Sequence, residues 1–152
     1  MDAKSFLHRL LHAFDAPEPD PLPEPDEKLA LGTLLVRVAK SDLTYVFAEI
    51  SQIDRLLTRL FDLGPIEAAK MRATCERLDK EAPETEKFAR IIREMVSFDA
   101  RLDALEALWE VVLADGSIRT QEIEVISKVQ IALGLSEEDS VAAKAKAMEQ
   151  MG

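Results

Sequence analysis

Cysteine, glycine and aromatic residues are all scarce in this chain, and basic residues are outnumbered by acidic ones. Cys75 is the single cysteine, so no disulfide can form within the chain, and we expect a small buried residue there rather than a reactive thiol. Acidic residues outnumber basic ones, 29 to 19, and the net charge is −10. This balance disfavours a nucleic-acid partner, because phosphates are bound by basic surfaces.

Long apolar runs and targeting signals are also missing. No apolar run approaches the roughly 20 residues of a membrane span, and the first residues lack the apolar core and small-residue cleavage site of a signal peptide. We therefore expect a cytoplasmic protein, and we do not expect it to bind membranes.

The chain lacks the Walker loop and the GxGxxG, HExxH and GxSxG motifs, and no serine, histidine and aspartate are placed as a triad. His8 and His12 could share a helix face, but a zinc site needs further ligands, and none is nearby in the sequence. The sequence thus predicts no catalytic residues and a protein that is not an enzyme.

What the chain does contain is a persistent helical pattern. Leu31, Leu34, Leu35 and Val38 follow the i, i+3, i+4, i+7 spacing of a core-facing stripe. No window alternates with a period of two for long enough to indicate a strand. The fold class is therefore all-α, with about seven helices in a compact bundle. The other six apolar stripes lie within residues 46–60, 68–78, 88–95, 102–112, 123–133 and 141–148.

Proline and glycine mark where several of these helices begin and end. Pro65 suits the first turn of a helix, and Gly134 suits a helix C-terminus. Ser136, with Asp139 three residues later, is typical of a helix start.

The N-terminal region differs from the rest. Residues 1–14 form a predicted amphipathic helix, residues 15–25 a stiff, acidic, proline-rich linker, and residues 26–152 the helical domain. The apolar stripe of the first helix could dock on the protein's own body or join a homodimer. A partner's groove or a membrane is the alternative, but the acidic linker would be repelled by anionic lipid. The stripe consists of Phe6, Leu7, Leu10, Leu11 and Phe14.

A short pattern occurs twice: an apolar helix end, an aspartate, and a glutamate seven residues later. Asp42 and Glu49 form the first copy, and Asp115 and Glu122 form the second. A shift of 73 residues superimposes the two pairs and their apolar neighbours. The repeat predicts two related helical hairpins, whose acidic turns would lie close together if the hairpins pack about an approximate two-fold axis.

Two interpretations of the four carboxylates are open. Oxygen ligands from two turns suit a divalent cation such as Ca²⁺ or Mg²⁺, so Asp42, Glu49, Asp115 and Glu122 are candidate metal ligands. The same residues could instead cap the helices that follow. An EF-hand is excluded, because two of its oxygen-ligand positions, counted from Asp115, would fall on the basic side chain of Arg119 and on Ile126.

The second copy lies in VVLADGSIRTQEIEVISKVQIALGLSEED, residues 111–139, which resembles the TerB-like tellurite-resistance family. The resemblance covers roughly residues 27–149. It implies a bundle of about seven helices in two related halves, an acidic surface suited to divalent metal, and a bacterial stress-response role with no established catalytic mechanism. The first copy departs from the family pattern, since Leu43 replaces the turn glycine. We expect Leu43 to resist the left-handed backbone that Gly116 allows.

Together these observations predict a non-enzymatic TerB-like domain that binds a protein partner and a divalent cation. A purely structural or oligomerisation module without metal is one alternative. A metal-dependent hydrolase that uses the same four carboxylates is the other.

Overall fold

The computed structural model of the protein describes residues 22–82 and 84–152, and this part of the chain is helical, with no strand. The prediction of an all-α bundle of about seven helices is confirmed. The predicted helix over residues 1–14 and most of the linker lie outside the described residues. The helices are α2 (Glu27–Lys40), α3 (Phe47–Phe61), α4 (Pro65–Glu81), α5 (Thr85–Met95), α6 (Phe98–Leu113), α7 (Thr120–Ala132) and α8 (Glu137–Met151).

The helix ends follow the predicted signals. Pro65 is the first residue of α4, where its missing N–H would have no partner in any case. Gly134 follows α7 with φ 74°, a left-handed conformation that suits glycine. Ser136 and Asp139 form a reciprocal cap at the start of α8, with N···O distances of 3.0 and 2.9 Å.

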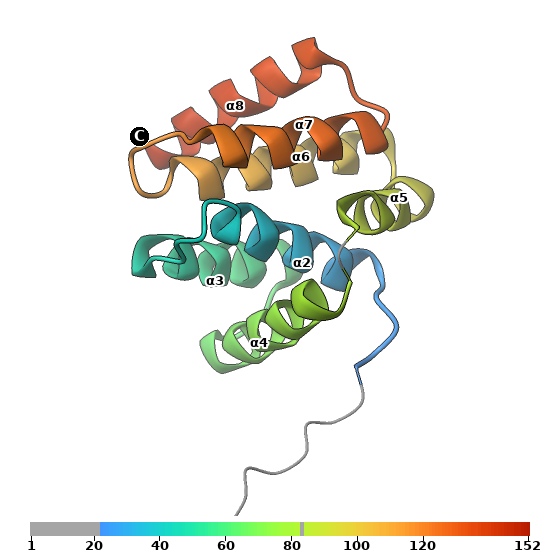
Figure 1. The fold of residues 1–152 in the computed structure, drawn as a ribbon, viewed down its shortest axis with the longest axis vertical. Coiled ribbons are helices and arrows are strands. Elements are labelled where there is room, and N and C mark those ends of the chain that lie inside the picture. The colour runs from blue at the N-terminus through green and yellow to red at the C-terminus, as the bar shows by residue number, and fades with distance from the viewer. Residues whose placement is uncertain (1–21, 83) are drawn as a thin grey trace, which may run out of the picture.

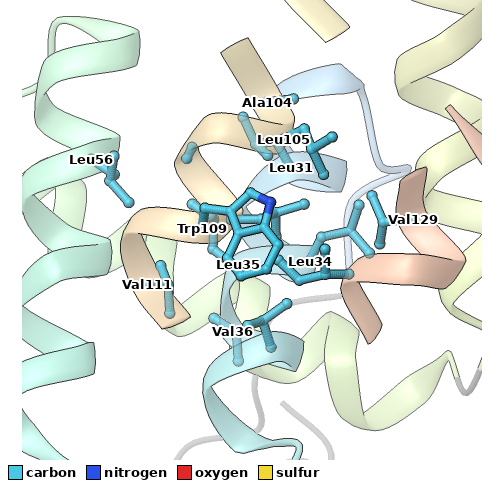
Figure 2. Packing of buried hydrophobic residues seen from close by; sticks show 14 of the residues in the cluster. Leu31, Leu34, Leu35, Val36, Leu56, Ala104, Leu105, Trp109, Val111 and Val129 are labelled. Atoms are coloured by element: carbon cyan, nitrogen blue, oxygen red, sulfur yellow. The ribbon is translucent and has the colours of Figure 1, made fainter. Parts of the chain in front are cut away.

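Helices α2 and α6 pack against each other at the centre of the bundle (Figure 1). Their apolar stripes meet in one core, which Figure 2 shows around the indole of Trp109. This indole is almost fully buried, and its Nε1 donates to Ser140 Oγ at 3.1 Å. Cys75 is fully buried, as predicted, and burial raises the pKa of its thiol to about 12. It faces Gly32 where α4 crosses α2, and a Cβ at Gly32 would lie 2.5 Å from Cys75 Sγ.

The two hairpins, α2–α3 and α6–α7, pack crosswise. Helix α3 contacts α6, α7 contacts α2, and α4 packs on α2 as α8 packs on α6. This is the pattern expected for two copies related by an approximate two-fold rotation. Residues 41–46 connect the first hairpin and residues 114–119 connect the second, and both connections lie at the same end of the bundle (Figure 1). The fold thus brings the two acidic turns together.

Candidate acidic site

The two aspartates hold their turns in the same way. Asp42 Oδ1 accepts hydrogen bonds from Thr44 N at 3.0 Å and Thr44 Oγ1 at 2.7 Å. Asp115 Oδ1 accepts one from Ser117 N at 3.0 Å. Hydrogen bonds from an amide two residues on are the usual way in which aspartate fixes a turn. The Thr44 hydroxyl lowers the pKa of Asp42, and the nearby Arg119 adds to this effect.

The two glutamates occupy the third residue of the following helix. Glu49 Oε1 accepts from Val46 N at 3.4 Å, and Glu122 Oε1 accepts from Arg119 N at 2.9 Å. Each bond satisfies an amide at the start of a helix that has no partner within the helix. The capping interpretation of the glutamates is therefore confirmed. It does not account for their burial, since both side chains are only 1% exposed.

The backbone of the first turn differs from the sequence prediction. Leu43 has φ 66°, close to the φ of 81° at Gly116, so the expectation that the first turn departs from the glycine-like shape is wrong, although leucine adopts this left-handed conformation only at an energetic cost. The hydrogen bonds that Thr44 donates to Asp42 hold the turn in the glycine-like shape, and the two connections are equal in length. The Leu43 side chain is 97% exposed, so packing does not offset the resulting backbone strain.

Leu43→Gly is therefore expected to stabilise the protein by about 1 kcal/mol, the strain relieved exceeding the added entropy of the unfolded chain. Urea denaturation checks this prediction. Gly116→Ala is the matched control and should destabilise by a similar amount, because a Cβ at Gly116 meets no atom within 4 Å and only the backbone conformation opposes it. A less stable Leu43→Gly protein would contradict the prediction.

Arg119 joins the two turns. Its Nε lies 2.7 Å from Asp42 Oδ2 in the other hairpin, and its Nη2 lies 4.0 Å from Asp115 Oδ2. The Asp42 side chain is nearly buried, whereas the Arg119 side chain is 45% exposed. The expectation that the two acidic turns lie close together is thereby confirmed, with a guanidinium between their aspartates.

All four predicted residues share one electrostatic environment. Burial raises the pKa of Glu49 to about 7, with further contributions from the carboxylates of Asp115, Glu122 and Asp42. Burial also raises the pKa of Glu122 to about 7, and Asp115 and Asp42 contribute again. The Glu122 Oε2 atom is buried and accepts no hydrogen bond from any described residue. A buried carboxylate oxygen without a partner is costly, which points to a ligand or a proton at this position.

The donor chemistry of this cluster suits a hard divalent cation, since all four side chains offer carboxylate oxygens. Within residues 22–82 and 84–152, however, no three His, Cys, Asp or Glu side chains converge in an arrangement that could hold a metal ion. The positive charge between the aspartates comes instead from Arg119. The oxygen donors are therefore close together but are not gathered around a common point.

Comparison with known families places both acidic turns in one domain. The family model of tellurite resistance protein TerB matches residues 28–145. The chain belongs to the TerB family. The match runs from the second residue of α2 into α8, so it includes both hairpins and the four carboxylates. No curated protein and no solved structure matches the chain.

Sequence reasoning missed the role of Arg119 in this TerB domain. In the sequence, Arg119 is a basic residue at a position where an EF-hand requires an oxygen ligand. Its position four residues after Asp115 is a local signal for an ion pair, but its shorter contact is with Asp42 of the other hairpin. No helix in the described part of the chain is long and apolar enough to cross a membrane. His8 and His12 lie outside the described residues.

Proposed function

We propose that this TerB domain is a non-enzymatic, cytoplasmic binding module of a bacterial stress response, and that it binds a divalent cation through Asp42, Glu49, Asp115 and Glu122. The observation that carries the proposal is the buried Glu122 Oε2, which has no partner among the described residues and lies in the field of the other acidic side chains. Ca²⁺ or Mg²⁺ is the class of ligand that such oxygens prefer.

A divalent cation would offset two of the four negative charges when it is present, and the four side chains would have to gather around it in place of Arg119. The cation would compete with protons, because the pKa of both Glu49 and Glu122 is about 7. Affinity should therefore fall as the pH drops below about 7. Cation binding would also change the charge of the two connecting turns, which lie on the surface of the bundle.

The partner-binding part of the proposal is supported by apolar side chains on the same turns and at the start of α3. Leu43 is 97% exposed and Phe47 is 82% exposed, and Ile118 of the second turn is also exposed. Large apolar side chains exposed beside polar groups are typical of protein–protein contact sites. A protein partner that contacts these residues would sense whether the carboxylates carry a cation.

Calorimetric titration of the full chain with CaCl2 and with MgCl2 at about pH 8 tests the cation proposal. We expect binding heat from the wild-type protein and at least tenfold weaker binding by Glu122→Gln, because the substitution removes one of few charged ligands. Glu124→Gln is the control: Glu124 is an exposed acid on the same helix. No heat from the wild-type protein, or equal affinity in both variants, would contradict the proposal.

Specific observations also support a second candidate function, a structural module that binds no cation. The glutamates cap their helices and Arg119 pairs with Asp42, so the cluster has a structural role without a ligand. The same titration separates the two functions, since a purely structural cluster would give no specific heat with either cation.

A further inference from the structure

An apolar groove lies at the end of α2 that is remote from the acidic turns. It has a volume of about 170 Å³, comparable to the cavity of about 150 Å³ that accommodates benzene in another protein. Its walls come from the start of α2, the end of α3, the end of α5 and the start of α6. The apolar lining residues include Leu31, Leu60, Phe61, Ile92 and Val96. The groove therefore suits a large apolar side chain from an approaching segment.

The rim of this groove carries two acids, and one base lies beside it: Lys28 Nζ is 5.8 Å from the centroid of the Phe61 ring. Glu27 and Asp103 line it, and neither forms an ion pair with another described residue. A complementary segment would combine an apolar stripe with basic residues. Residues 1–14 have this composition: the predicted stripe from Phe6 to Phe14 lies beside Lys4 and Arg9, against a single acid. Charge and apolar character thus favour this segment of the protein as the occupant.

The linker determines which copy of the groove the segment can reach. The groove lies beside the point where the linker joins α2, since Glu27 lies on the rim of the groove and is the first residue of α2. Residues 15–25 contain five alternating prolines, which favour an extended chain of about 3.1 Å per residue, or roughly 30 Å in all. A linker with this predicted stiffness and length would carry the segment away from the groove of its own chain.

We infer that residues 1–14 of one copy dock in this groove of a second copy, so that two chains exchange their N-terminal segments. The occupant is the helix that the sequence predicts for residues 1–14, held by burial of its apolar stripe and by attraction between its basic residues and the acids on the rim. Exchange is reciprocal, because each copy offers one segment and one groove. The inference is independent of the cation proposal, since the groove and the acidic turns lie at opposite ends of α2.

Sedimentation velocity of the full chain over a dilution series tests the exchange. We expect a concentration-dependent dimer whose dissociation constant rises about 10- to 100-fold in Leu10→Glu, because a charge replaces an apolar contact. Ser5→Glu is the matched control, since Ser5 falls on the opposite face of the predicted helix, and its dimer should be unchanged. A wild-type protein that is monomeric throughout, or equal weakening by both substitutions, would overturn the inference.

Cysteine cross-linking separates exchange from docking within one chain. Full-length Leu10→Cys and Ala100→Cys proteins with different tags are mixed and mildly oxidised. Ala100 is a suitable position because it lines the groove and is partly exposed. The native Cys75 should not interfere, because it is fully buried. We expect a mixed disulfide between the two chains, and far less with Ser5→Cys in place of Leu10→Cys. A protein that carries both Leu10→Cys and Ala100→Cys and forms a disulfide only within its own chain would overturn the inference. Equal cross-linking of Leu10→Cys and Ser5→Cys to Ala100→Cys would also overturn it.

Discussion

Replacement of Glu49 and Glu122 together by glutamine is expected to stabilise the cation-free TerB domain at about pH 8 by on the order of 3 kcal/mol. Both carboxylates are buried, and both have a pKa near 7 instead of the ordinary value of 4.5. At that pH folding therefore requires two charges to remain in an unfavourable environment. Glutamine removes the charge and keeps a carbonyl oxygen for the capping bonds from Val46 N and Arg119 N.

The same shifts determine how stability depends on pH. Between about pH 4.5 and pH 7 the folded protein binds more protons at Glu49 and Glu122 than the unfolded chain does. The stabilising effect of these protons is fully present below the unfolded pKa, decreases as the pH rises through 7, and is absent above it. Asp42 acts in the opposite sense, because its pKa is lowered, but it titrates below this window.

Urea denaturation in the presence of a chelator, at intervals from about pH 5 to pH 8, measures this dependence. Wild-type stability should fall across the interval, and the Glu49→Gln/Glu122→Gln protein should show a flatter profile. Glu124→Gln, which alters an exposed acid on α7, should follow the wild-type profile. If the double variant retains the wild-type slope, the two glutamates do not titrate in this range and the explanation is wrong.

The sequence predicted the local features of this fold because their causes are local. An apolar stripe, a proline in a first turn or a glycine after a last turn acts within a few residues, so Pro65 and Gly134 were placed correctly. The repeat also predicted that the acidic turns approach each other, since equivalent hairpins pack in equivalent ways. The conformation of Leu43 was predicted wrongly, because the turn hydrogen bonds outweigh the preference of a single residue.

Contacts between distant segments were the part that local patterns could not predict. Glu110 lies on α6 and is 1% exposed, and its partner is Arg59 of α3, with Nη2 and Oε2 separated by 2.7 Å. The shift of 73 relates Glu110 to Arg37, which instead pairs with Asp79 of α4 at 2.7 Å. Equivalent positions thus carry opposite charges, because each hairpin packs against different neighbours. Arg119 belongs to the same class, since its contact with Asp42 depends on how the hairpins are packed.

Arg119→Gln is expected to destabilise the cation-free domain by about 2 kcal/mol at about pH 8. Loss of one partner from a buried ion pair costs about 3–5 kcal/mol, and the 45% exposure of the Arg119 side chain reduces this value. The substitution leaves Asp42 nearly buried without its counter-charge. It also removes an attraction that lowers the pKa of Glu122. Arg119→Lys keeps the charge but loses the planar guanidinium, so its stability should be intermediate.

A double-mutant cycle separates the electrostatic role of Arg119 from simple packing. If the guanidinium compensates the charge of the whole cluster, Arg119→Gln should cost less in the Glu49→Gln/Glu122→Gln background, where two of the four negative charges are gone. Equal cost in both backgrounds, measured by urea denaturation, would restrict its role to the single pair with Asp42. The contact that joins the two hairpins, between Arg119 and Asp42, therefore lies within the proposed cation site. Arg119 holds the acidic turns together without a cation, and it is also the residue that a bound cation would replace. Under the cation proposal, Arg119→Gln should therefore lower the stability of the cation-free domain and raise its affinity for calcium about tenfold.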